Sequence, residues 1–248
     1  MMATEEMICE VNDRLKLIQR RDGLTFGTDA LLLAGYVRGK YKSGIELGSG
    51  TGIITMLLLT REKLGRAVCL EVQPEYADLT ERNAALNGLS ERVEAVSVDL
   101  RDYRCERECE IVYTNPPYMR TDTGRANLSD KKNIARHEVS GSISDFVKGA
   151  ARMLKFGGDF YAVYRTDRLA ELISAMTSAG IEPKRMTTVH ADAGARPSMV
   201  LVEGRRGGGE GMRMTMPLII YKDEKHGEYS DDMNYIMERG SFPDKYKV

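Results

Sequence analysis

The chain has 248 residues, of which 42% are hydrophobic and 29% are charged, and its formal net charge is −1. This composition is typical of one large globular domain, and binding of a polyanion by overall charge is excluded, so local basic clusters would have to provide it. The four cysteines do not suggest a disulfide framework, and none of the three histidines is spaced as a metal ligand. Neither a signal peptide nor an apolar run of membrane-spanning length is evident. We therefore expect a cytoplasmic protein with reduced thiols, no metal and no membrane association.

The N-terminal part is expected to precede the main fold. Residues 1–13 are polar and predict a frayed start. Apolar residues at 15–19 and 24–26 flank an Asp-Gly pair, which predicts a hairpin with its turn at that pair. An apolar run at 30–37 then predicts a helix that Thr28 or Asp29 can cap.

A glycine-rich turn follows the first strand of the main fold. Gly48, Gly50 and Gly52 lie between an apolar stretch and a helical pattern over residues 55–63. Such glycines permit positive φ and let a ligand approach the backbone at a helix N-terminus. A dinucleotide-binding fold would fit this turn too. Glu46, just ahead of the first glycine, suits a cationic ligand group such as an amine or a sulfonium better than a pyrophosphate.

Acidic residues also end the next two predicted strands. The strand 67–71 ends in Glu71, where a carboxylate can accept hydrogen bonds from both ribose hydroxyls of an adenosine-type cofactor. The strand 92–98 is followed by Asp99, which is placed to accept from an adenine amine. A single acid at a strand end is usually a helix cap. With Glu46, three successive strand ends carry an acid, and this pattern indicates a binding site.

The tetrapeptide Asn115-Pro116-Pro117-Tyr118 follows an apolar run at 111–114. Two successive prolines have no N–H to donate, so the chain must leave the sheet in a stiff, extended turn. The turn offers an amide oxygen, carbonyls and an aromatic ring, which suit a planar substrate that bears an amine. The alternative interpretation is a rigid strand exit with an incidental Asn and Tyr. The glycines and acids upstream favour the substrate site.

A polar segment at 120–137 follows and is rich in cations. Long loops beside a site are commonly functional or mobile, and this one can follow a phosphate backbone or form a solvated loop. Both interpretations stay open. The cations are Arg120, Arg125, Lys131, Lys132 and Arg136.

The C-terminal half continues the alternation of helices and strands. Because alternating elements imply a parallel sheet covered on both faces, we expect an α/β fold, with the last two strands adding one antiparallel edge strand. The expected division is an N-terminal hairpin and helix at 1–40, a catalytic fold at 41–206 and an extension at 207–248. The predicted elements are helices at 143–154 and 168–179, strands at 159–164, 185–190 and 198–203, and a tail with an apolar stretch at 216–221 and a helical piece at 230–237.

Together these motifs resemble the class I S-adenosylmethionine-dependent methyltransferases, over roughly residues 25–205. The resemblance implies a Rossmann-like fold with an about seven-stranded, mostly parallel sheet and helices on both faces. The tetrapeptide is similar to that of members that methylate an amino or amide nitrogen. Phe26-Gly27-Thr28-Asp29, Ala135-Arg136-His137-Glu138 and Pro217-Leu-Ile-Ile-Tyr221 further resemble the tRNA (adenine-N6)-methyltransferases that modify an adenine beside the anticodon of a valine tRNA.

This resemblance implies S-adenosylmethionine as cofactor, tRNA as substrate, and a role for each matching residue. Asn115, Pro116 and Tyr118 would be catalytic, with Asn115 also beside the cofactor, and the five cations of the polar segment would bind RNA. We expect a monomer or a homodimer. For the cofactor, the implied contacts are Gly48, Gly50 and Gly52 with the methionine part, Glu46 with its amino group, Glu71 with the ribose, Asp99 and Leu100 with the adenine, and Thr28 from the N-terminal side.

Other functions fit parts of the same pattern. A glutamine-N5 protein methyltransferase uses the same kind of tetrapeptide, but such enzymes usually carry a helical domain ahead of the catalytic fold, and only about forty residues precede Glu46. An rRNA base N-methyltransferase also fits. A DNA-adenine methyltransferase would need a target-recognition domain, and a non-catalytic RNA-binding module would not need the intact acids.

Overall fold

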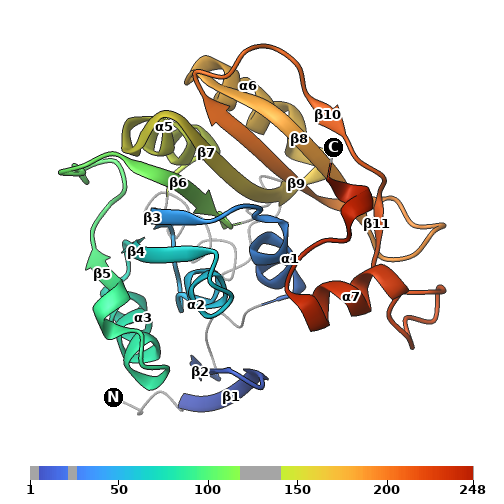
Figure 1. Ribbon diagram of the computed structural model, residues 1–248, viewed down its shortest axis with the longest axis horizontal. Helices are drawn as coiled ribbons and strands as arrows, with labels where there is room; N and C mark the ends of the chain where they lie inside the picture. Colours follow the sequence, from blue (N-terminus) through green and yellow to red (C-terminus); the bar gives the residue numbers. More distant parts are fainter. Residues whose placement is uncertain (1–5, 22–26, 118–140, 248) are drawn as a thin grey trace, which may run out of the picture.

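The computed structural model describes residues 6–21, 27–117 and 141–247. One large sheet organises them, with seven long strands in the spatial order β8-β9-β7-β6-β3-β4-β5 (Figure 1). Two short strands, β10 (Arg213–Met214) and β11 (Leu218–Ile219), lie along β8. The long strands are β3 (Tyr41–Leu47), β4 (Leu64–Glu71), β5 (Val93–Ser97), β6 (Cys109–Thr114), β7 (Leu154–Arg165), β8 (Ile181–His190) and β9 (Pro197–Arg206).

The sheet is parallel except at β9, which runs antiparallel to both β7 and β8. The predicted mostly parallel α/β sheet with one antiparallel strand is therefore confirmed. The position of that strand differs from the prediction, because β9 lies inside the sheet and not at its edge. The short connection between β8 and β9 pairs them as neighbours, and β9 then inserts beside β7.

Helices cover both faces of the sheet, as Figure 1 shows. Successive strand residues point to opposite faces, so Tyr113 of β6 joins one hydrophobic cluster and Val112 joins the other. This burial on both faces explains why the strands are continuous apolar runs. One cluster packs under α1 (Thr28–Tyr36), α2 (Ile53–Thr60), α3 (Pro74–Leu86) and α7 (Asp231–Arg239), and the other under α5 (Ile143–Met153) and α6 (Leu169–Ser178).

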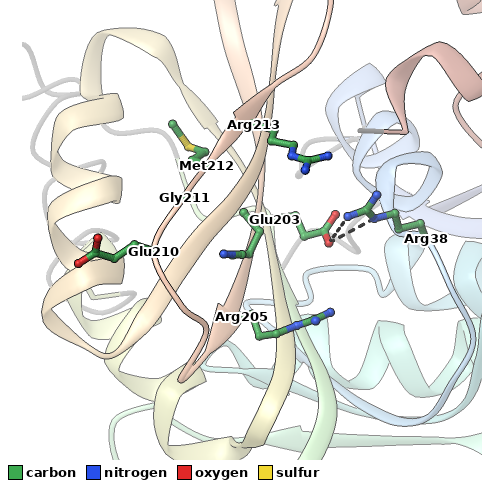
Figure 2. Close-up of a pocket in the computed structure, with 8 residues that line it drawn as sticks. Arg38, Glu203, Arg205, Glu210, Gly211, Met212 and Arg213 are labelled. Carbon is green, nitrogen blue, oxygen red and sulfur yellow. Dashed lines mark hydrogen bonds and ion pairs between the residues drawn. The ribbon is translucent and has the colours of Figure 1, made fainter.

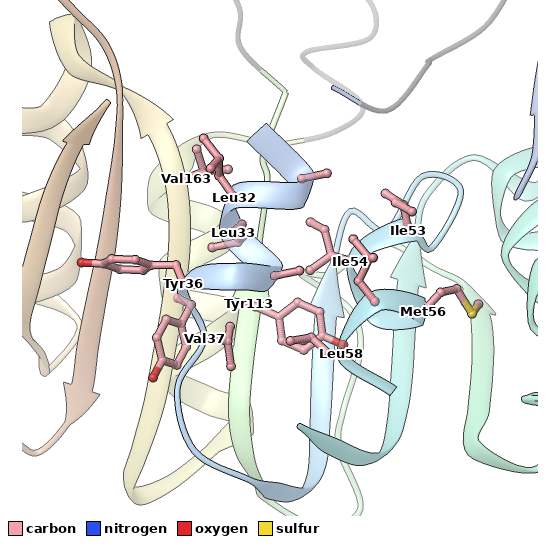
Figure 3. Close-up of a cluster of buried hydrophobic side chains, with 14 of the residues drawn as sticks. Leu32, Leu33, Tyr36, Val37, Ile53, Ile54, Met56, Leu58, Tyr113 and Val163 are labelled. Carbon is pink, nitrogen blue, oxygen red and sulfur yellow. The ribbon is translucent and has the colours of Figure 1, made fainter. Parts of the chain in front are cut away.

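The first cluster brings the N-terminal helix α1 against α2. Figure 3 shows Leu33 on the side of α1 that faces Ile54 of α2, with Leu58 of α2 beside Tyr113 of β6. Tyr36 points away from α2, and its ring packs edge-on against Tyr161 of β7. The C-terminal tail completes this cluster with the buried residues Met233, Ile236, Phe242 and Tyr246. The tail, in which the sequence showed no chemistry, therefore contributes to the core.

The N-terminal residues form a hairpin that differs from the predicted one. β1 (Glu6–Asn12) pairs antiparallel with β2 (Leu15–Arg20), so residues 6–12 are a strand and not a frayed start. The turn lies between these strands, and the predicted partner strand at 24–26 falls outside the described residues. Asn83 of α3 fixes the hairpin: its Oδ1 accepts from Ile18 N at 2.6 Å and its Nδ2 donates to the Thr51 carbonyl at 3.0 Å.

Candidate active site

The carboxyl ends of the four parallel strands β3, β4, β5 and β6 form one edge of the sheet. Open α/β folds bind ligands at this carboxyl-terminal edge. Leu47, the last residue of β3, is paired with Thr114 of β6 on one side and with Leu70 of β4 on the other. Glu71 is paired with Ser97 of β5. The glycine-rich turn, the Asn-Pro-Pro turn and the segment that carries Asp99 therefore leave neighbouring strands at this edge.

The glycine-rich turn has a left-handed backbone at three positions, with φ of 68° at Gly48, 55° at Gly50 and 76° at Gly52. L-residues rarely adopt such angles, which explains the glycines. A Cβ at Gly52 would lie 2.8 Å from Cγ2 of Thr80, so packing also requires this glycine. A Cβ at Gly50 would meet nothing within 4 Å. The turn therefore keeps open space beside Gly50, directly before α2.

Glu71 ties this turn to the end of β4. Its Oε2 accepts from Gly50 N at 2.9 Å and its Oε1 accepts from Gln73 N at 3.0 Å. The residue is 6% exposed, and burial raises the pKa of its carboxyl, although hydrogen bonds from Gln73, Gly50 and Val72 oppose the shift. Glu71 therefore places a carboxylate beside Gly50, where a diol can donate to it.

Glu46 faces the protein interior and not the open edge of the sheet. It is 1% exposed, and its Oε2 accepts from Thr55 Oγ1 at 2.5 Å and from Thr55 N at 3.2 Å. Burial raises the pKa of Glu46 to about 8. The expected direct contact of Glu46 with a ligand amino group therefore does not fit this geometry. The carboxyl group instead satisfies the first turn of α2, whose N–H groups have no partner within the helix.

Asp99 pairs with Arg101, which was not among the site residues predicted from the sequence. Its Oδ1 accepts from Arg101 N at 2.8 Å and from Arg101 Nε at 2.9 Å. The Arg101 guanidinium holds the pKa of the Asp99 carboxyl below its usual value. The next residue, Leu100, is buried, and its carbonyl accepts from Arg152 Nη2 of α5 at 3.0 Å. Asp99 is therefore a fixed, ionised acceptor at the end of β5.

Asn115 lies directly beyond β6 and contacts the start of α1. Its Nδ2 donates to Oδ2 of Asp29 at 2.9 Å. Asn115 and Thr28 are half-buried, and Pro116 is buried. Asp29, which the sequence indicated only as a possible helix cap, therefore belongs to this site. No short-range pattern predicts a contact between residues 86 positions apart.

Several predicted site residues fall outside the part of the chain that the structure describes. They are Tyr118, Arg120, Arg125, Lys131, Lys132 and Arg136. Within the described ranges, no group of three or more His, Cys, Asp or Glu residues is arranged to hold a metal ion. The helices found there are too short or too polar to cross a membrane.

A cavity of about 560 Å³ lies at the other end of the sheet, near the start of β3 (Figure 2). It is rich in cations, several of which have acceptors: Arg38 Nη2 donates to Glu203 at 3.0 Å and Arg205 Nε to Asp159 at 2.8 Å. These pairs tie β9 to β7 and to the segment before β3. The lining residues are Arg38, Lys184, Glu203, Arg205, Glu210, Gly211, Met212 and Arg213.

The strand order of the large sheet, the antiparallel strand β9 within it and the glycine-rich turn after β3 define a class I methyltransferase fold. Residues 20–178 match the family model described as the methyltransferase small domain. The chain belongs to this family and is a methyltransferase.

Solved structures share this fold. A predicted O-methyltransferase from Agrobacterium tumefaciens matches with a TM-score of 0.70 and 22% identity, over 87% of this chain and 98% of its own. TYW2 from P. horikoshii, solved in complex with MeSAdo, matches with a TM-score of 0.58 and 14% identity, over 83% of this chain and 73% of its own.

Curated relatives match most of the chain. The tRNA1(Val) (adenine(37)-N6)-methyltransferase of Bacteroides thetaiotaomicron is 27% identical over 71% of this chain and 74% of its own length. The proteins of the same name from Bacteroides fragilis and Porphyromonas gingivalis are 28% and 25% identical, over 71% and 77% of this chain and 75% and 78% of their own lengths.

Proposed function

We propose that the protein transfers a methyl group from S-adenosylmethionine to the exocyclic nitrogen of an adenine in tRNA, with the adenine at position 37 of a valine tRNA as the substrate. The names of the curated relatives support this substrate. The observation that carries the proposal is the position of Asn115-Pro116 at the end of β6, beside the glycine-rich turn that ends the neighbouring strand β3.

The residues at this edge fit the cofactor. The space beside Gly50 would admit its methionine part, and Glu71, next to Gly50, would accept from the ribose hydroxyls. Asp99 and Leu100 would contact the adenine, and Thr28 would cover the cofactor from α1. Glu46 would support the site indirectly, because its hydrogen bond with Thr55 holds α2 in place. When bound, the cofactor supplies a methyl group that is already activated by the sulfonium.

Asn115 and Pro116 would act on the nitrogen that receives the methyl group. An exocyclic adenine nitrogen is a weak nucleophile because its lone pair is delocalised into the ring. Asn115 Oδ1 and the Pro116 carbonyl would each accept one of its N–H groups and favour a geometry that directs the lone pair at the methyl group. Both oxygens also stabilise the positive charge that develops on the nitrogen. In-line placement provides the rest of the rate enhancement, because the bond between nitrogen and the methyl carbon would form as the bond between that carbon and sulfur breaks. The methylated nitrogen would then release one of its two protons to solvent.

The segment after Pro117 would complete the substrate site. Tyr118 would stack on the adenine, which an anticodon loop can present with little loss of base stacking. Arg120, Arg125, Lys131, Lys132 and Arg136 would contact phosphates of the RNA. These roles are proposals from the sequence, since the residues lie outside the described ranges.

The purified protein is tested with methyl-labelled S-adenosylmethionine and, in separate reactions, the tRNA, rRNA and protein fractions of a cell that lacks it. The proposal predicts label in N6-methyladenosine of the tRNA fraction. An Asn115→Ala variant should lower that rate about a hundredfold, as the loss of one preorganised hydrogen bond does in other enzymes. Label in N5-methylglutamine or in rRNA alone would contradict the proposed substrate.

A further inference from the structure

Asp29 and Asn115 join two segments that are far apart in the sequence, the start of α1 and the end of β6. Asn115 Nδ2 donates to Asp29 Oδ2 at 2.9 Å. The other oxygen of Asp29, Oδ1, accepts from Ala30 N at 2.9 Å. One carboxylate therefore receives a side-chain donor and a helix N–H at once, which fixes its own orientation.

This contact determines which edge of the Asn115 amide faces the substrate. The two edges of an amide are nearly equal in shape but opposite in hydrogen-bonding character. A carboxylate only accepts, so the NH₂ group must face Asp29 and the oxygen must point to the other side. The reversed amide would place its oxygen against a negatively charged oxygen, which is repulsive.

We propose that Asp29 is a positioning residue for methyl transfer: it holds the amide of Asn115 in the orientation in which Oδ1 accepts from the nitrogen to be methylated. This inference rests on the proposed function. Without Asp29, the amide loses the acceptor that fixes its NH₂ edge, and the reversed orientation presents a donor to a nitrogen that must itself donate. Loss of the partner that orients a metal-ligating side chain typically costs about 10- to 100-fold in activity, and we expect a loss in the same range here.

Gly27 leaves room for this carboxylate. A Cβ at Gly27 would lie 2.7 Å from Asp29 Oδ1, which is too close for the carboxylate to keep its present position. Gly27→Ala therefore moves the carboxylate without removing it. This gives a second perturbation of the same contact that leaves both partners chemically intact.

The test is a double-mutant cycle on single-turnover methyl transfer to the tRNA substrate, with cofactor affinity measured in parallel. Asp29→Asn should slow transfer about 10- to 100-fold while cofactor affinity changes less than about twofold. In the Asn115→Ala background the same substitution should have almost no effect, because the group it positions is gone. Gly27→Ala should slow transfer in the same direction as Asp29→Asn.

A double variant in which the side chains of residues 29 and 115 are exchanged tests whether methyl transfer can be rescued. Asp29→Asn combined with Asn115→Asp restores one amide donor facing one carboxylate, and transfer should be faster than in either single variant. Asp231→Asn is the matched control, since Asp231 is also in the first turn of a helix, α7, and should leave transfer unchanged.

Two outcomes separate this inference from the proposed function. If Asn115→Ala impairs transfer but the Asp29 and Asn115 effects multiply, Asp29 does not act through Asn115 and the inference is wrong. If Asn115→Ala itself transfers at the normal rate, the role proposed for Asn115 is wrong, and the inference fails with it. Thermal unfolding of each variant identifies any that does not fold, and Gly27→Ala then carries the test.

Discussion

Thr55 Oγ1 donates to Glu46 Oε2 at 2.5 Å, and both residues are buried beneath the glycine-rich turn. The hydroxyl oxygen of Thr55 also lies 2.6 Å from the hydroxyl of Tyr113 on β6. One polar chain therefore links β3, α2 and β6, the elements that carry the cofactor turn and the Asn-Pro-Pro turn. We expect Glu46 to support the site through this chain.

The pH dependence of stability should report the burial of Glu46. Because the pKa of Glu46 is raised from 4.5 to about 8 in the folded protein, its protonated form is favoured by folding. Its stabilising contribution is complete below pH 4.5 and is lost as the pH rises through about 8. Urea unfolding at pH 5, 7 and 9 should show the wild type losing free energy of unfolding relative to Glu46→Gln. If the free energies of unfolding of the wild type and Glu46→Gln change in parallel with pH, the pKa of Glu46 is not raised in the folded protein.

Alanine substitutions at two glycines with similar backbone angles distinguish the effect of backbone strain from the effect of ligand contact. Gly50 and Gly88 have φ of 55° and 68°, and an added Cβ meets nothing within 4 Å at either position. Each Gly→Ala substitution should therefore cost about 1–2 kcal/mol of stability. Only Gly50→Ala should also weaken cofactor binding, since its methyl group enters the proposed ligand space. Equal cofactor affinity in both variants, measured by calorimetry, would place the cofactor elsewhere.

Glu71 should be needed as a carboxylate and not only as an acceptor of matching shape. In Glu71→Gln the single amide oxygen can serve Gly50 N or Gln73 N, while the NH₂ group opposes the other donor. We expect cofactor affinity to fall about tenfold or more, as for other hydrogen bonds to charged groups. Glu75→Gln, an exposed change in the first turn of α3, is the control and should leave affinity unchanged.

The ion pair at the far end of the sheet should support stability and not catalysis. Arg185 Nε donates to Glu203 Oε2 at 2.8 Å, and the two side chains are 2% and 4% exposed. Glu203→Gln leaves a buried guanidinium without its counter-charge and should cost about 3–5 kcal/mol. Glu6→Gln, which breaks an exposed pair with Arg82, should cost less than about 1 kcal/mol. Chemical denaturation distinguishes the two, and equal losses would contradict the account.

The positions of Glu71 and Asp99 in the fold follow from local pattern. They could be predicted because an acid at the carboxyl end of a parallel strand lies at the same edge of the sheet as the ends of the neighbouring parallel strands. Asp29 could not be placed, since its partner Asn115 comes from a distant strand. The orientation of Glu46 was also hidden, because facing the interior or the ligand depends on how α2 leaves the glycine turn.

The fold was predictable to a similar extent. Alternating strands and helices indicated the parallel sheet, but the position of β9 depends on pairing over a long range. β1 was not predicted, because the apolar Ile8 between Met7 and Cys9 interrupts the polar alternation that marks a half-buried strand. The tail showed no chemical motif, and only the packing of Phe242 and Tyr246 reveals its place in the core.

Transfer of a methyl group to one adenine nitrogen in tRNA is tested most directly with a defined substrate. An unmodified valine tRNA transcript is incubated with the protein and S-adenosylmethionine, beside a transcript whose adenine 37 is replaced by guanine, and nucleosides are identified by mass spectrometry. We expect about one N6-methyladenosine per molecule in the first transcript and none in the second. Equal methylation of both transcripts, or of neither while another substrate is methylated, would contradict the proposed function.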